Sequence, residues 1–307
     1  MSITATLSLA FLLVTFSVVQ QKRPAGKEQL QSSDVPTQRE ENIPLEIGEN
    51  SKPHLPEQTP NEFKLLSYNI RWRSGDELQK LIKLFREDNK IGKASILALQ
   101  EVDRNKKRTG NINTVKQIAA ELGYYYAWTA PPRERSATEE ETGVAILSAY
   151  PLSDVHRIVL PNEGPNKRRR VALGATIELC GVKTRLYSIH SETRIAMDKK
   201  LEQMSAVIQD LTHYPTETPA VILGDLNTWE PAAGPKVRKL FTSAAFNTPF
   251  GNESTFSRKV LLFPVILRLD WVWLRGFQTV NFGIDRDVAI SDHFPLWITL
   301  KLPDGQP

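Results

Sequence analysis

The sequence predicts an α/β (α+β) fold with four layers, in which two packed, mixed β-sheets are flanked by helices. From residue 63 onward, short apolar runs alternate with amphipathic helical patterns. Some runs follow one another without a helix, as on either side of Cys180 and Gly181, which indicates antiparallel hairpins mixed with α/β crossovers. Neither a Gly-x-Gly-x-x-Gly nor a Walker loop occurs, which argues against a doubly wound nucleotide fold.

Eight apolar runs are predicted to be strands, because they are short and rich in aliphatic and aromatic residues that suit a pleated surface. They span residues 63–70, 95–102, 143–149, 171–179, 184–190, 219–226, 269–274 and 295–300.

Three helices are predicted between these strands. The first opens at Asp76, which follows Gly75 and could cap it, and the apolar residues from 78 to 85 fall on one of its faces. The second covers residues 113–122. The third runs from about residue 195 to 211, where apolar residues repeat at helical spacing and indicate a core-facing stripe.

The first 62 residues differ from the rest. Residues 3–19 are apolar and free of charge, long enough for the core of a signal peptide and just long enough to span a membrane, so residues 1–20 are either a signal peptide or an N-terminal anchor. Residues 21–62 hold six of the 20 prolines and no aromatic residue, which predicts a disordered linker. A folded domain follows over 63–302, with a tail at 303–307.

Charge is distributed unevenly along the chain. The linker has 5 basic and 8 acidic residues, a net of −3, whereas residues 63–307 have 34 basic and 27 acidic, a net of +7. A modestly basic domain suits phosphates, nucleic acid or anionic lipid, although a solvated surface with excess lysine gives the same balance. The single cysteine, Cys180, excludes an intrachain disulfide.

Four short motifs, LSYNI, LQEVD, ILGDLNT and SDHFPL, each end or interrupt an apolar run with polar residues that can bind metal or carry protons. At a strand end, residues two apart face the same side, so Asp225 and Asn227 should share one cleft. A carboxylate and an amide suit a divalent metal and a phosphate ester. The residues that we expect in this cleft are Asn69, Glu101, Asp225, Asn227, Asp292 and His293.

Two further residues extend this set. His190 ends the strand TRLYSIH, and Arg170 opens another strand as the third residue of an arginine run. In a cleft, an arginine would hold phosphate oxygens, whereas an ordinary charge run would be a solvated turn. Asp292 and His293 precede a buried strand, where they could form an acid–base unit or simply cap a loop.

Taken together and in order, these motifs resemble the endonuclease/exonuclease/phosphatase superfamily, which has the DNase I-like fold, over residues 63–302. The match consists of LSYNI, LQEV, GVAILS, an arginine before a strand, SIHSE, GDLNT, RLDWVW and SDHFPL. The resemblance implies a catalytic domain that hydrolyses phosphate esters by attack of water.

The resemblance also implies roles at the metal site. Glu101 would be the principal Mg²⁺ ligand, with Asn69 beside it and Asp292 contributing; Mn²⁺ is an alternative metal. Asp270, in RLDWVW, would orient His293, which would contact the scissile phosphate.

The remaining roles implied by the resemblance concern water and substrate. Asp225 would position or deprotonate the attacking water, Asn227 would bind the phosphate, and His190 would act as general acid or phosphate contact. Arg170 occupies a position where many members place a substrate-binding arginine. No motif residue is missing, which disfavours a non-catalytic binding module on the same fold.

The substrate is the least determined feature. We expect a nuclease-type phosphodiesterase, with a phospholipid, sphingomyelin-type or sugar-phosphate esterase as the alternative. Basic residues at 106–108 and 167–170 could follow a nucleic-acid backbone. Residues 260–267, VLLFPVIL, are expected in the core or at a sheet edge, or else as an apolar tongue that touches lipid. The N-terminal segment favours an exported or membrane-anchored enzyme, and no protein partner is evident.

Overall fold

Two mixed β-sheets pack face to face in the structure, a computed structural model that describes residues 44–49, 62–132, 141–261 and 263–303. In spatial order the larger sheet contains β1 (Leu45–Gly48), β4 (Tyr125–Thr129), β5 (Glu141–Ser148), β3 (Ile96–Arg104), β2 (Glu62–Asn69), β14 (Leu296–Lys301) and β13 (Gln278–Ile284). The smaller contains β12 (Asp270–Arg275), β9 (Ala220–Asp225), β8 (Val182–His190), β7 (Val171–Leu179) and β6 (Ser153–Val159). In each sheet one neighbouring pair is parallel, β2 with β3 and β8 with β9.

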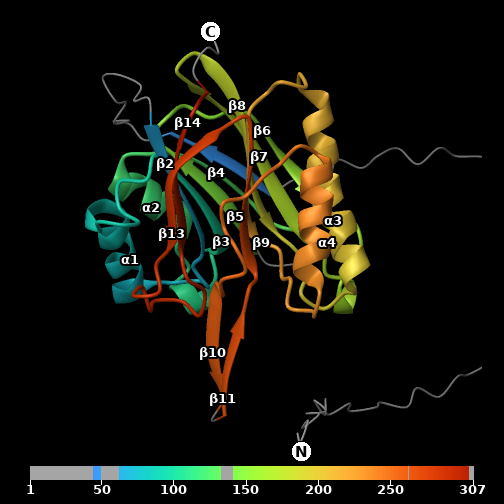
Figure 1. The fold of residues 1–307 in the computed structure, drawn as a ribbon. Helices are drawn as coiled ribbons and strands as arrows, with labels where there is room; N and C mark the ends of the chain where they lie inside the picture. Colours follow the sequence, from blue (N-terminus) through green and yellow to red (C-terminus); the bar gives the residue numbers. More distant parts are fainter. Residues whose placement is uncertain (1–43, 50–61, 133–140, 262, 304–307) are drawn as a thin grey trace, which may run out of the picture. The chain divides into compact units, whose positions relative to one another are not determined.

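Helices cover the outer face of each sheet (Figure 1). The larger sheet is covered by α1 (Gly75–Glu87) and α2 (Thr114–Leu122), and the smaller by α3 (Met197–Asp210) and α4 (Ala233–Ser243). Short 3₁₀ helices lie at Lys107–Thr109, Pro165–Lys167 and Leu211–His213. The predicted four-layer α/β sandwich is therefore confirmed.

Both faces of the central strands are buried. In β2, Leu65 packs into the core between the sheets and the next residue, Leu66, packs under the helices; Ile96 and Leu97 of β3 divide in the same way. Successive side chains point to opposite faces of a strand, so burial on both sides requires an unbroken apolar run. This explains why these strands were recognisable in the sequence.

The first helix begins differently from the prediction. Ser74 occupies the N-cap position and makes no side-chain capping hydrogen bond, so the assignment of Asp76 as a cap is wrong. Asp76 lies in the first turn, where a negative charge is stabilised by the positive end of the helix dipole. By contrast, Asn113 does cap α2, since its side chain accepts a hydrogen bond from the N–H of Lys116.

One strand lies inside the stretch that was predicted to be a disordered linker. β1 pairs with β4 in antiparallel register, with Leu45 opposite Thr129. Glu46 secures this edge strand by accepting hydrogen bonds from Tyr126 at 2.8 Å and Arg104 at 3.0 Å. The prediction that 21–62 is disordered throughout is therefore wrong at 45–48.

The segment from 260 to 267 was expected in the core or at a sheet edge, and the core assignment is wrong. It forms most of a separate two-stranded hairpin, β10 (Phe256–Val260) and β11 (Phe263–Leu267), which extends away from both large sheets in Figure 1. No helix among the described residues is long and apolar enough to cross a membrane. Residues 1–20 and most of the tail lie outside the described residues.

Candidate active site

Three strand ends and one strand start position the candidate site. Asn69 ends β2, His190 ends β8 and Asp225 ends β9. The parallel register of β8 and β9 places His190 beside Asp225, and Asp270, the first residue of β12, lies opposite Asp225 on the other side. Asn69 reaches across from the larger sheet and donates a hydrogen bond of 3.1 Å to Asp225 Oδ2. Polar residues from separate strand ends thus meet.

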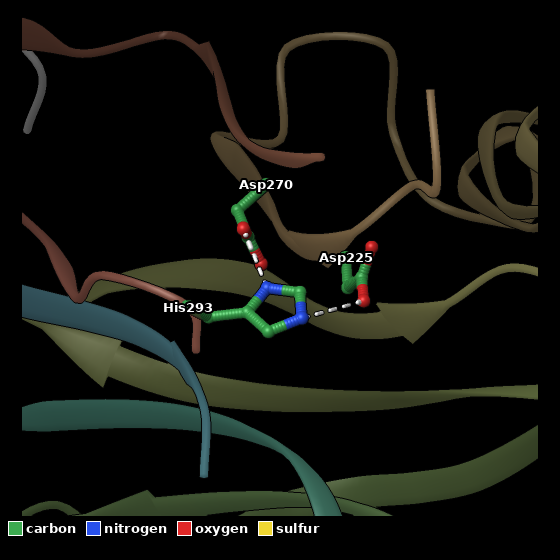
Figure 2. Close-up of side chains that lie close together, drawn as sticks. All are labelled: Asp225, Asp270 and His293. Carbon is green, nitrogen blue, oxygen red and sulfur yellow. Dashed lines mark hydrogen bonds and ion pairs between the residues drawn. The ribbon is translucent and has the colours of Figure 1, made fainter. Parts of the chain in front are cut away.

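His293 lies between two carboxylates (Figure 2). Its Nδ1 is 2.8 Å from Asp270 Oδ2, and its Nε2 is 3.8 Å from Asp225 Oδ2. All three side chains are buried, with exposed fractions of 1% for Asp270, 2% for Asp225 and 6% for His293. The ring of Phe256 packs edge-on against the imidazole, with 5.0 Å between the centroids. This contact helps to hold the histidine in one orientation.

The surroundings give the two histidines different protonation states. Burial alone would lower the pKa of His293, but Asp270 and Asp225 raise it, so this imidazole carries a proton at neutral pH. Burial and the neighbouring Arg170 lower the pKa of His190, which is therefore neutral. Burial raises the pKa of Asp225, although the positive charge of His293 opposes the increase. A raised pKa makes this carboxylate a better proton acceptor near neutrality.

Arg170 belongs to the site through His190. Its Nη1 lies 3.2 Å from His190 Nδ1, and its Nε donates to Glu192 Oε2 at 3.0 Å. Because an arginine can only donate, Nδ1 accepts and the proton of the neutral ring is on Nε2. This nitrogen is 3.6 Å from Asp225 Oδ2. Glu192 had no predicted role, although it follows closely in the motif SIHSE.

Asn227 contributes through its backbone. Its N–H donates to Asp225 Oδ1 at 2.9 Å, its φ is 51°, and its side-chain Nδ2 donates to the carbonyl of Ser191. The fully buried Lys200 donates to the carbonyl of Asn227 at 2.7 Å and to Glu230 at 2.8 Å. Sequence reasoning missed Lys200, because a lysine in an amphipathic helix is normally solvated.

Glu101 lies in a β-bulge that directs its side chain toward Asn69. The register of β3 against β5 shifts between Gln100 and Val102, and Glu101 between them has a φ of 54°. Its carboxylate accepts hydrogen bonds from Trp72 Nε1 at 2.5 Å and from Asn69 Nδ2 at 3.4 Å. Asn69 therefore bridges Glu101 and Asp225.

The donor chemistry of Glu101 and Asn69 fits Mg²⁺ or Mn²⁺, which prefer carboxylate and carbonyl oxygens. Among the described residues, one group of three acidic or histidine side chains has its ligand atoms within 4.8 Å of one another, namely Asp225, Asp270 and His293. A protonated imidazole has no lone pair for a metal. The hydrogen bond between His293 Nδ1 and Asp270 Oδ2 accounts for the proximity of these two side chains.

Asp292, which was expected at the metal site, forms a salt bridge in the structure. Its Oδ2 lies 2.6 Å from Nη1 of Arg71. Arg71 and Trp72 have φ values of 46° and 53°, a left-handed conformation that is uncommon for arginine and tryptophan and is not predicted by the sequence. They connect Asp292 and Glu101 to the same turn after β2, and no sequence pattern could have found them.

The profile of the endonuclease/exonuclease/phosphatase family matches residues 66–293, a range that contains every side chain of the site described above. This chain belongs to that family. Members hydrolyse phosphate esters and usually use a divalent metal, so family membership indicates a phosphoesterase in general terms.

Solved structures of family members share its fold. A Beutenbergia cavernae endonuclease/exonuclease/phosphatase has a TM-score of 0.62 at 18% identity, covering 78% of this chain and 72% of its own. The human Nocturnin catalytic domain, with bound sulfate, has a TM-score of 0.60 at 18% identity, covering 79% and 95%. ANGEL2, a 2′,3′-cyclic phosphatase in complex with adenosine-2′,3′-vanadate, has a TM-score of 0.58 at 14% identity, covering 78% and 96%. No curated protein sequence matches the chain.

Proposed function

We propose that this family member is a divalent-metal-dependent phosphodiesterase that hydrolyses its substrate by attack of an activated water molecule. The observation that carries the proposal is the buried array in which His293 lies between Asp270 and Asp225. Asn69 joins Asp225 to Glu101, so the proton-handling residues and the metal-binding oxygens share one cluster.

In this proposal Asp225 holds the attacking water and accepts its proton. Its Oδ1 is fixed by the N–H of Asn227, which leaves Oδ2 facing Asn69 and the two histidines. Burial raises its pKa toward neutrality, where a general base works best. We therefore assign the proton transfer from water to Asp225.

His293, His190 and Arg170 would offset the negative charge that develops on the phosphate. His293 carries the positive charge closest to Asp225, and Asp270 keeps its ring oriented. His190 is neutral and has its proton on Nε2, so it would donate a hydrogen bond to a phosphate oxygen rather than a proton to the leaving oxygen. Bound by Glu101 and Asn69, with Asp292 as an additional ligand, Mg²⁺ or Mn²⁺ would act as a Lewis acid on a phosphate oxygen.

A nucleic-acid strand is our first candidate substrate. Arg168 supports it, because 48% of its side chain is exposed beside the buried Arg170 and its Nε lies 3.9 Å from Glu192 Oε2, a looser pairing than that of Arg108. Arginines at such a rim can bind successive phosphates of a strand. The other predicted basic cluster supports it less, since Arg108 is paired with Asp103 at 2.7 Å.

A lipid phosphodiester is the second candidate, with sugar phosphates as the remaining alternative. The observation that favours lipid is the exposed apolar hairpin formed by β10 and β11. Its base is hydrogen-bonded to the loop that carries His293, through Ser257 N–H to the Asp292 carbonyl at 2.9 Å.

Hydrolysis of bis-p-nitrophenyl phosphate with Mg²⁺ or Mn²⁺, and its loss on chelation, tests the reaction. Glu101→Gln should lower activity and also weaken Mn²⁺ binding measured by electron paramagnetic resonance, whereas Glu87→Gln, an exposed helix residue, should change neither. Absence of hydrolysis with either metal would favour the non-catalytic binding module. Plasmid DNA, RNA, sphingomyelin and inositol phosphates, compared under the same conditions, then separate the substrate classes.

We further propose that residues 1–20 export the protein or anchor it in a membrane. The support is the charge-free apolar segment at residues 3–19. Expression of the full chain, followed by N-terminal sequencing of the product and fractionation of the cells, distinguishes a cleaved signal from a retained anchor. Uncleaved protein in the cytosolic fraction would contradict both.

A further inference from the structure

The hairpin of β10 and β11 exposes large apolar side chains around its tip. The exposed fractions are 90% for Leu261, 74% for Phe263, 57% for Ile266 and 49% for Val260. Scattered single apolar residues are common on protein surfaces, but several together mark a contact with a partner or a membrane. The tip is therefore a candidate interaction surface.

The exposed apolar residues lie on both faces of the hairpin. Val260 and Phe263 are paired across the strands and share one face, whereas Ile266 is opposite Ser257 on the other. Leu261 lies in the turn beyond them. A protein partner would cover one face of such a ribbon, whereas a lipid layer surrounds the tip on all sides. This distribution favours lipid.

The charges of the hairpin indicate which lipid surface it fits. Residues 256–267 contain two basic residues, Arg258 and Lys259, and no acidic residue. Both are exposed and lie directly before the apolar tip. Basic side chains at this position can extend to anionic headgroups while the apolar residues enter the layer below.

We propose that this hairpin docks the protein on the surface of an anionic membrane, with Leu261 and Phe263 in the boundary between headgroups and acyl chains. Phe256 at the base forms a bridge with His293, and four residue steps separate it from Val260. At about 3.3 Å per residue this is about 13 Å, against an insertion depth of about 5–10 Å for interfacial segments. The candidate active site is then within reach of the headgroup phosphates.

The docking step does not require the proposed phosphodiesterase activity, but its consequence for substrate choice rests on it. A docked hairpin would present the site to a phosphodiester in a lipid headgroup. The backbone contacts at its base support this, since Phe294 N–H donates to the Thr255 carbonyl at 2.7 Å. The hairpin and the His293 loop are therefore one connected piece of structure.

A polarity-sensitive fluorophore at the tip tests insertion directly. In the full chain with Cys180→Ser, Leu261→Cys is labelled and mixed with vesicles of phosphatidylcholine containing phosphatidylglycerol. The control is the same label at Val280→Cys, an exposed apolar position on β13. We expect a blue shift and stronger emission at 261 and none at 280. Emission at 261 that stays water-like on these vesicles would overturn the proposal.

The label at the tip also separates lipid from other occupants. A blue shift at 261 without vesicles, with a larger particle in analytical ultracentrifugation, would show that a second copy covers the hairpin and would overturn membrane docking. Pure phosphatidylcholine vesicles should give a weaker response, since they lack anionic headgroups. Equal responses on both vesicle types would refute the role assigned to Arg258 and Lys259.

Activity measurements on a vesicle substrate and a soluble substrate test whether docking delivers lipid to the candidate active site. Leu261→Glu places a charge at the tip. The variant also lacks the leucine side chain that would be buried in the lipid, and this loss alone should weaken vesicle binding by about tenfold. Hydrolysis of a vesicle lipid phosphodiester should fall by a similar factor, while hydrolysis of bis-p-nitrophenyl phosphate stays unchanged. Equal vesicle-lipid activity of Leu261→Glu and wild type would contradict the delivery of substrate by docking. If neither substrate is hydrolysed by wild type, the proposed function fails, and the fluorescence result still decides docking.

Discussion

Replacing Asp270 with asparagine removes one charge from the buried array while keeping the shape of the side chain. Asp270 Oδ2 lies 2.8 Å from Nδ1 of His293, and both groups are buried. Opposite charges with centres about 4 Å apart contribute about 4 kcal/mol at an effective dielectric constant of 20. Since about 1.4 kcal/mol changes a rate tenfold, Asp270→Asn should lower kcat by about 10³-fold if the positive charge of His293 is used in the transition state.

The assay is steady-state hydrolysis of bis-p-nitrophenyl phosphate with saturating Mg²⁺. The matched control is Asp285→Asn, because Asp285 is also a buried aspartate with a cationic partner, Lys90 at 3.1 Å, but belongs to a different part of the fold. Thermal unfolding of both variants separates lost chemistry from lost structure. A wild-type kcat in Asp270→Asn, or an equal loss in Asp285→Asn, would refute the proposed role of the array.

Three further changes test other parts of the structure. Asp225→Asn should lower kcat by at least about 10²-fold, and retained activity would exclude its role as proton acceptor. Lys200→Met removes two hydrogen bonds made by a buried ammonium group and should lower the free energy of unfolding in urea by about 3 kcal/mol; an unchanged value would contradict its role as a support. Burial alone would raise the pKa of Asp210, but hydrogen bonds from His156 and Tyr187 lower it. Its stabilising contribution is thus present above its ordinary pKa and lost below it, so Asp210→Asn should flatten the acid-side fall in unfolding free energy below about pH 4.

The sequence revealed eight strands that are continuous apolar runs, including β12 at an edge of the smaller sheet, and it missed the short buried strand β4 and three other edge strands. β1, β6 and β13 are edge strands, and their mixed polar and apolar residues produce no continuous run. The helix α4 was missed because Gly234 and Pro235, near its start, disfavour helix in the sequence. Pro235 is tolerated there because the first turn does not need its N–H.

The part of the candidate site that was predictable consists of residues at the ends of strands. Asn69, His190 and Asp225 occupy such ends, so the pattern of apolar runs followed by polar residues predicted that they would lie in one cleft. The salt bridge between Asp292 and Arg71 was not predictable, because it joins residues 221 positions apart through a turn of unusual conformation.

Backbone strain near Glu101 could not be predicted from the sequence, and it bears on how rigid the proposed metal site would be. Arg71, Trp72 and Glu101 all have positive φ values, each costing about 1–3 kcal/mol in a residue other than glycine. Reciprocal contacts hold the strain in place: Trp72 N–H donates to the Glu101 carbonyl at 2.9 Å, and its indole donates to the Glu101 carboxylate. Arg71 N–H donates to Asn69 Oδ1 at 3.1 Å. Glu101 and Asn69, two of the three proposed metal ligands, are thus held by the same strained turn, so a bound metal would not have to order them.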